Sequence, residues 1–213
     1  CGPGPGRDGH FDFTTVEQRF GHILKADPEA RFHLRIQLEV SPAEVWWHNL
    51  YPQQREIDSG GNPCTQSHAS PLWRQQAKDF LAAFAQHLKD IGMAERVFAY
   101  QTGAGHTGEW VKGLTSMRTP CGDYSAPMAQ HFRAWLADHY GDEEALRDAW
   151  QNGKVKLHNA EVPPPEAQWE TQHWSFRDPR REQQVIDYYH CFADLCGDLV
   201  VDFIHIVNSP VML

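Results

Sequence analysis

The chain has 213 residues, of which 41% are hydrophobic and 22% charged, and this balance is typical of a globular protein rather than a disordered one. Its formal net charge of −9 argues against nucleic-acid binding, which requires a basic face. No apolar run approaches the roughly 18 residues of a membrane span. We therefore expect one globular domain, or a large part of one, with neither nucleic acid nor membrane as its partner.

The first part of the chain predicts a helix, a strand and a long loop. Residues 11–26 carry apolar side chains at helical spacing and predict the helix. Residues 32–40 alternate apolar with polar side chains and predict the strand. A long polar loop with Trp46 and Trp47 near its start is expected to follow, up to about Ala69.

A second helix and a second strand come next. Ser70 followed by Pro71 is typical of a helix start, and apolar residues then form one stripe as far as Ile91. The short apolar run at residues 97–101 predicts a buried strand. Two strands joined by a helix in this way predict a parallel pair within an α/β fold.

The second half of the chain is predicted to be mostly helical. Apolar residues in steps of three and four predict helices over residues 126–140, 142–150 and 180–208. Only two strands are predicted in the whole chain, whereas a (β/α)₈ barrel needs eight and about 250 residues. The chain begins without Met and stops as an apolar stretch starts, so we expect an internal fragment of a longer protein with an incomplete sheet.

The strand at residues 97–101 leads into a loop with three glycines, and that loop ends in Glu109 and Trp110. In a β/α barrel, loops at the carboxyl ends of the strands carry the catalytic groups. Glycoside hydrolysis normally needs two carboxyl groups, one of which protonates the leaving oxygen, and apolar neighbours favour the protonated form. The sequence thus points to Glu109 as a proton donor. The alternative is an ordinary carboxylate of a loop or a helix cap.

Further residues near the strand ends are candidates for sugar binding. The eight tryptophans are many for this length, and an indole face can cover the C–H face of a pyranose. Trp46 and Trp47 would serve as sugar platforms or would pack beneath the loop. His106 would bind a hydroxyl group, orient Glu109 or be solvated. The remaining candidates are Tyr100 and Gln101, which should point to opposite sides of the strand, and Trp110.

The glycines also permit a weaker interpretation as a nucleotide site. Gly103, Gly105 and Gly108 match the spacing of the Gly-x-Gly-x-x-Gly dinucleotide fingerprint. However, Glu109 and Trp110 would put negative charge and bulk where the pyrophosphate meets the start of a helix. We therefore expect no cofactor.

A metal site is the other weak interpretation. Cys64 and His68, with Cys121 further along the chain, suggest metal ligands, but their spacing fits no standard zinc pattern. The five cysteines are instead expected to be reduced thiols. Cys191 and Cys196 are five residues apart on a predicted helix, so they should point in different directions and not pair.

Several segments form an ordered series of motifs along the chain. Phe11-Asp-Phe13 stands before a helix, which is followed by a strand, a proline and tryptophans. Phe132-Arg-Ala-Trp-Leu136 and Leu146-Arg-Asp-Ala-Trp150 come after the acid-bearing strand, and Asp187-Tyr-Tyr189 comes in the last predicted helix. In this order they resemble the opening of the barrel, the excursion after the acid-bearing strand and the following helix in family 42 of the glycoside hydrolases, the β-galactosidases.

The resemblance implies a retaining glycosidase on a (β/α)₈ barrel, of which residues 1–213 would be a fragment incomplete at both ends. It implies that Glu109 is the acid/base, after the fourth strand of the barrel, and that the nucleophile glutamate lies beyond Leu213. The family usually has Asn-Glu where this chain has Gly108-Glu109, and the missing amide would bind the sugar 2-hydroxyl. A non-catalytic carbohydrate-binding protein, in which Glu109 only hydrogen-bonds sugar, is the alternative function.

Overall fold

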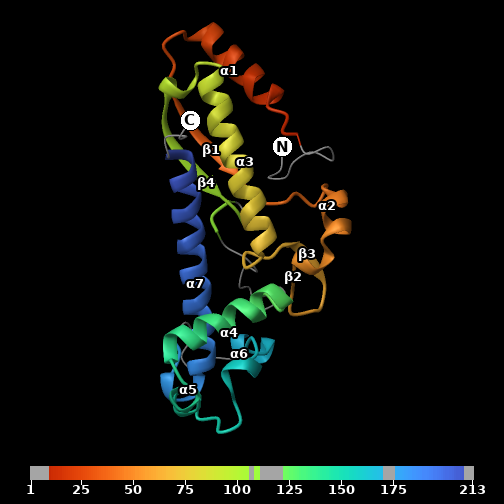
Figure 1. Cartoon of the computed structure of the whole chain (residues 1–213), viewed down its shortest axis with the longest axis vertical. Coiled ribbons are helices and arrows are strands. Elements are labelled where there is room, and N and C mark those ends of the chain that lie inside the picture. Colours follow the sequence, from red (N-terminus) through yellow and green to blue (C-terminus); the bar gives the residue numbers. More distant parts are fainter. Residues whose placement is uncertain (1–9, 106–107, 111–121, 170–175, 209–213) are drawn as a thin grey trace.

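The structure is a computed structural model, and it describes residues 10–105, 108–110, 122–169 and 176–208. Figure 1 shows an elongated molecule with a pair of strands and their helices at one end and a group of shorter helices at the other. The longest helix, α7 (Pro179–Asn208), runs through both parts. Within the described residues, no helix combines the length and apolar character that crossing a membrane requires.

The predicted crossover unit is confirmed. It consists of β1 (Phe32–Gln37), α3 (Pro71–Asp90) and β4 (Val97–Gly103), with α1 (Thr14–Ala26) before β1 and the short 3₁₀ helix η2 (Ala94–Arg96) leading into β4. β1 and β4 pair in parallel, with Gln37 beside Gly103 at their carboxyl ends. The Ser70 hydroxyl accepts the backbone N–H of Trp73 at 3.0 Å and caps α3, as the Ser-Pro pair predicts.

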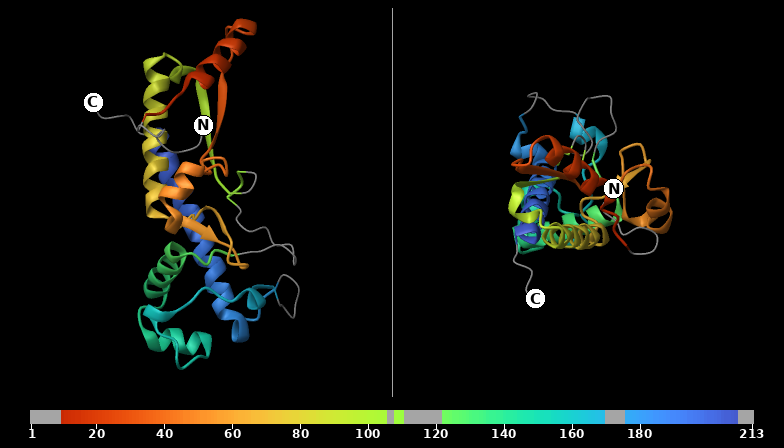
Figure 2. Two further views of the ribbon diagram at one scale, coloured as in Figure 1. Left: turned by 90° about the vertical axis from the view of Figure 1, so that its right-hand side faces the viewer. Right: turned by 90° about the horizontal axis from the view of Figure 1, so that it is seen from above.

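The two faces of this strand pair differ in chemistry. Phe32 and Ile36 are buried on the face that the helices cover, and the ring of Phe32 lies 4.7 Å from that of Phe20 in α1. Figure 2 shows α3 and α7 on this side of the strands. On the opposite face of β1 the side chains are polar and exposed, and they belong to His33, Arg35 and Gln37. This second face is called the open face below.

The prediction of one long polar loop between β1 and α3 is wrong. The segment contains α2 (Val45–Leu50), the 3₁₀ helix η1 (Pro52–Gln54), and the antiparallel strands β2 (Arg55–Ile57) and β3 (Pro63–Gln66). The Asp58 carboxylate closes the hairpin by accepting the N–H groups of Gly60 and Asn62, both at 2.8 Å. Strand β1 also ends earlier than predicted, because the Val40 N–H bonds to the side chain of Gln66 at 2.9 Å and not to a strand.

The helices of the second half are confirmed, with ends within one residue of the predicted ones. They are α4 (Ala126–Tyr140), α5 (Glu143–Trp150) and α7, with the short η3 (Leu157–Asn159) and α6 (Pro165–Trp169) in between. A buried carboxylate ties three of them together: Asp187 accepts the Tyr140 hydroxyl at 2.7 Å and the Trp150 indole N–H at 2.6 Å. Burial, and then the bond to Asp187, raise the pKa of Tyr140, so its hydroxyl remains a proton donor.

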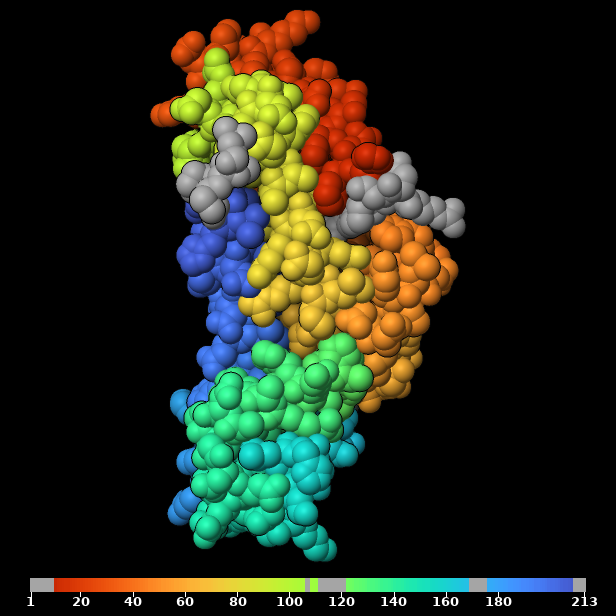
Figure 3. Space-filling model, viewed as in Figure 1, coloured from red at the N-terminus to blue at the C-terminus, as the bar shows by residue number. Residues whose placement is uncertain are grey.

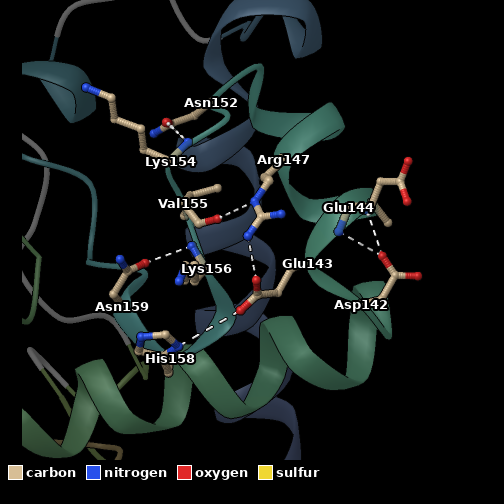
Figure 4. A network of polar contacts seen from close by, with 11 residues as sticks. Asp142, Glu143, Glu144, Arg147, Asn152, Lys154, Val155, Lys156, His158 and Asn159 are labelled. Atoms are coloured by element: carbon tan, nitrogen blue, oxygen red, sulfur yellow. Dashed lines mark hydrogen bonds and ion pairs between the residues drawn. The ribbon is translucent and has the colours of Figure 1, made fainter.

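Polar contacts also hold the turn that follows α5 (Figure 4). The Arg147 guanidinium donates to the carbonyl oxygen of Val155 at 3.0 Å and pairs with Glu143 at 2.5 Å. The N–H of Lys156 donates to the Asn159 side chain at 2.7 Å. These contacts satisfy backbone groups of the turn, so we assign the network a structural role.

Helices α3 and α7 lie side by side along the molecule, and α4 crosses beneath them (Figure 3). The interface between α3 and α7 is apolar at its centre, where the fully buried Trp73 and Phe203 meet edge to face with ring centroids 5.8 Å apart. Arg74 and Lys78 pair with Asp202 at its edge, at 2.7 and 2.6 Å. The core of the upper part therefore lies between these helices and the covered face of the strands.

Candidate functional site at the carboxyl end of β4

The chain folds back on itself directly after β4. The N–H of Gly108 donates to the carbonyl oxygen of Gly105 at 3.1 Å, and the N–H of Trp110 donates to that of Ala104 at 2.8 Å. Residues 108–110 form a turn. The sequence-predicted candidate His106 lies outside the described residues.

The glycines of this loop are explained by close packing on the open face. A Cβ at Gly103 would lie 2.7 Å from the carbonyl oxygen of Gly108, which is too close for any other residue without a shift. A Cβ at Gly108 would lie 2.5 Å from the Gln37 side-chain oxygen, and Gly108 has a φ of +75°. The glycine spacing thus serves a tight turn against β1, and this accounts for the pattern without a phosphate ligand.

Trp110 fixes the other side of the turn. Its indole N–H donates to the carbonyl oxygen of Thr102 at 3.2 Å, and its ring lies 5.6 Å from that of His68 and 6.0 Å from that of Phe203. Trp110 also has a positive φ of 62°, which is uncommon for a residue with a side chain. These contacts direct the tryptophan toward the helices, so it is an anchor for the turn.

Glu109 is exposed between these two fixed neighbours, at the carboxyl end of β4. Gly108 packs against β1 on the open face and Trp110 packs on the helix side, so the turn is contacted on both sides. A carboxyl group on an accessible turn that is held by its neighbours is able to exchange a proton with a bound ligand. The structure therefore places the residue at the strand end that the sequence predicts.

A second acid lies beside the loop, and the sequence interpretation did not single it out. Glu39, just after β1, accepts the N–H of Gly105 at 2.6 Å, the side-chain amide of Gln66 at 2.8 Å and the hydroxyl of Thr65. It joins β3 to the glycine loop. One feature of the sequence could have identified Glu39: it lies two residues after Gln37 and continues the series of polar positions in the alternating segment.

The other predicted sugar-binding residues divide between core and surface. Trp47 lies on α2, is 1% exposed and donates its indole N–H to Gln76 at 2.7 Å, so neither ring face is open to a sugar. Trp46 is partly buried and bonds to Glu44 at 2.5 Å. Of the two alternatives for these tryptophans, a sugar platform or packing beneath the loop, Trp47 fits packing.

The two residues of β4 lie on opposite faces, as strand alternation predicts. Tyr100 pairs with Leu34 and packs against the core, where burial raises the pKa of its hydroxyl. Gln101 pairs with Arg35 and is exposed on the open face. Of the two, only Gln101 faces the same side as the turn that carries Glu109.

The suggested metal ligands are not brought together. His68 is 1% exposed and is stacked between the rings of Trp73, at 5.5 Å, and Phe192, at 5.8 Å, with the Cys196 sulfur 3.8 Å from its Nδ1. Across the part of the chain that the structure describes, no group of three or more His, Cys, Asp and Glu could hold a metal ion. Cys121 lies outside that part.

The described cysteines are free thiols, as expected. They are Cys64, Cys191 and Cys196. Burial raises the pKa of the Cys191 thiol to about 12, so this side chain behaves as a small apolar core residue at neutral pH.

Solved structures of glycosidases share this α/β fold. A β-galactosidase from Bacillus circulans sp. alkalophilus aligns with a TM-score of 0.62 and 17% identity over 94% of this chain and 28% of its own. A catalytic mutant of a family 42 β-galactosidase from G. stearothermophilus aligns with a TM-score of 0.56 and 15% identity over 92% of this chain and 28% of its own. The catalytic domain of a β-amylase from Paenibacillus polymyxa aligns with a TM-score of 0.68 and 13% identity over 93% of this chain and 51% of its own.

The resemblance to the family 42 β-galactosidases is therefore confirmed as one of fold. The chain spans 28% of the length of both β-galactosidases. No protein-family model and no curated protein matches the sequence.

Proposed function

We propose that this chain is the acid/base-bearing part of a retaining, β-galactosidase-like glycoside hydrolase. In this proposal β1, α3 and β4 form one crossover unit of a (β/α)₈ barrel, with the open face of the strands turned toward the barrel interior. The observation that carries the proposal is the position of Glu109, exposed on a fixed turn at the carboxyl end of β4. The likeness of fold to glycosidases over more than 90% of the chain supports it.

The proposed chemistry has two steps. Glu109 protonates the glycosidic oxygen as a second carboxylate attacks the anomeric carbon, and Glu109 then removes a proton from the water that releases the sugar. In retaining enzymes the two carboxyl groups stand about 5–5.5 Å apart. We place the nucleophile outside these 213 residues, in the remainder of the proposed barrel.

The surroundings of Glu109 supply the proposed sugar contacts. Gln101 is exposed on the open face, and His106 belongs to the same loop. Trp110 holds the turn with its ring stacked on Phe203 of α7, and it would contact the sugar only with the part of its ring that remains accessible. Trp47 and Tyr100 are left out of the proposed site because both pack into the core.

The direct test is the hydrolysis of aryl β-galactosides by the complete gene product that contains these residues. Glu109→Gln keeps the shape of the side chain but removes the carboxyl group that gives and takes the proton, so kcat/KM should fall about 10²- to 10⁴-fold. The matched control is Glu95→Gln, since Glu95 is exposed at the opposite end of the same strand and should not affect turnover.

The results separate the two classes of function. Full activity in Glu109→Gln would contradict the assignment of the acid/base. Galactoside binding by the wild-type protein without any turnover would instead support a non-catalytic carbohydrate-binding protein, in which Glu109 serves only as a hydrogen-bonding group.

A further inference from the structure

The place where a side chain at residue 108 would stand is filled by a neighbouring strand. The Gln37 side-chain oxygen would be 2.5 Å from a Cβ at Gly108 and 3.3 Å from a Cβ at Gly103. The Arg35 guanidinium also reaches this spot, with its Nη2 3.3 Å from the same Cβ position at Gly108. Two polar side chains of β1 thus converge on the residue before Glu109.

The Gln37 carboxamide is exposed and only loosely held. Within the described residues its side-chain hydrogen bond runs from Nε2 to the carbonyl oxygen of Gly105, at the long distance of 3.5 Å. One N–H and the amide oxygen are therefore able to meet a ligand. A carboxamide with one donor and one acceptor suits a sugar hydroxyl, which both donates and accepts.

We propose that Gln37, together with Arg35, recognises a hydroxyl group of the sugar whose glycosidic oxygen meets Glu109. Gln37 is thus a specificity-determining residue delivered by β1, in place of a side chain at position 108. This inference rests on the proposed glycosidase function. It names the residue that would select the substrate, a role that residue 108 cannot fill because it is a glycine without a side chain.

The test compares a galactoside with its deoxy analogues in the complete gene product. The substrates are an aryl β-galactoside and the matched 2-, 3-, 4- and 6-deoxy compounds. The wild-type protein should prefer the parent to at least one analogue, because a site that binds a hydroxyl discriminates against its loss. In Gln37→Ala and in the similarly shaped Gln37→Leu that preference should shrink about tenfold or more.

A purely structural role for Gln37 gives a different result. If the side chain only supports the loop through Gly105, both variants will slow the parent and all deoxy analogues by the same factor, and this overturns the inference while leaving the proposed function intact. No hydrolysis of any galactoside by the wild-type protein overturns both. The matched control is His33→Ala, which removes another exposed side chain of the open face and should leave every preference unchanged.

Moving the carboxamide from residue 37 to residue 108 tests the inference independently. Asn tolerates a positive φ better than most residues, and removal of the Gln37 side chain makes room for it. The double variant Gln37→Ala/Gly108→Asn returns a carboxamide to the same place from the other chain segment. It should recover at least part of the lost discrimination. No recovery beyond Gln37→Ala, in a double variant that hydrolyses the parent galactoside as well as Gln37→Ala does, would contradict the proposal.

Discussion

Glu109 owes its exposure to its two neighbours. Gly108 is the residue without a side chain that lets the turn lie on β1, and Trp110 is the residue with a large one that holds the turn to the helices. The acid between them is exposed. Its position is therefore a consequence of backbone geometry that a substitution at residue 108 should disturb.

Replacing Gly108 by alanine should destabilise the protein for two separable reasons. The positive φ costs about 1–2 kcal/mol for a residue with a Cβ, and a smaller cost is added because the exposed Gln37 side chain must move aside from the new Cβ. Gly61→Ala is the matched control, because Gly61 has a φ of +79° but nothing within 4 Å of its Cβ position. Urea unfolding should show a larger loss for Gly108→Ala than for Gly61→Ala.

The excess loss should shrink when Gln37 is also changed to alanine, because the 2.5 Å contact is then absent and only the contact with the Arg35 Nη2 at 3.3 Å remains. Equal losses for the two glycine variants, or an excess that persists undiminished without Gln37, would contradict this explanation of the turn.

Asp123 makes the stability depend on pH. It is 2% exposed, accepts the Ser67 hydroxyl at 2.5 Å and the Ser125 N–H at 2.9 Å, and burial raises its pKa. A raised pKa in the folded state means that the folded protein holds this proton more tightly than the unfolded chain. The resulting stabilisation is fully present below the unfolded pKa of about 4 and is lost as pH rises through the folded pKa.

The variant Asp123→Asn should therefore remove a decline in stability with pH. Between pH 4 and pH 7 the free energy of unfolding should decrease more in the wild-type protein than in Asp123→Asn. Asp202 supplies a comparison of opposite sign, because its bond to Lys78 and then that to Arg74 lower its pKa, so its stabilisation is lost as pH falls through the folded pKa. A wild-type slope equal to that of Asp123→Asn would sink the prediction.

At the scale of elements, the α3–α7 interface should depend on apolar packing more than on its ion pairs. Phe203 is fully buried against Trp73, so Phe203→Ala should cost about 3–5 kcal/mol of unfolding free energy. Asp202 is about one-third exposed, and Asp202→Asn should cost less than about 1 kcal/mol.

The exposed neighbour Val201 is the control for this interface. It is 54% exposed, and Val201→Ala should change stability by no more than about 0.5 kcal/mol. Chemical denaturation of the three variants measures the loss of unfolding free energy in each and so ranks them. A loss in Asp202→Asn that matches the loss in Phe203→Ala would show that charge pairing holds these helices together.

The elements that the sequence revealed are the long ones. Periodicity needs several turns or alternations to stand out, and α3, α4 and α7 provide them. The strands β2 and β3 have three and four residues, too few for a pattern, so the segment was predicted as a loop. The alternation in β1 did show which residues share a face.

The candidate site was less predictable than the fold. The position of Glu109 followed from a strand and a glycine loop, both local features of the sequence. The contacts of Gln37 and Glu39 with that loop join residues more than 60 positions apart, and no local pattern encodes them. Residue type alone also could not separate Trp47, in the core, from a tryptophan at the surface.

For the molecule as a whole, we expect that the 213 residues alone do not turn over a glycoside. Hydrolysis with retention needs a nucleophile as well as an acid/base, and the proposal places the nucleophile elsewhere in the complete gene product. The purified chain, checked for folding by circular dichroism, should release no aryl alcohol from an aryl β-galactoside. Release that disappears in Glu109→Gln would show that the second carboxylate lies within these residues.

The role of Glu109 as proton donor is tested most directly by how the effect of Glu109→Gln depends on the leaving group of the substrate. A proton donor matters most when the departing oxygen is basic, so kcat/KM of the complete gene product should fall about 10²- to 10⁴-fold for an alkyl galactoside. For dinitrophenyl galactoside, whose leaving group departs without a proton, the fall should be far smaller. Equal losses with both substrates, or no loss with either, would contradict the role of Glu109 as the proton donor.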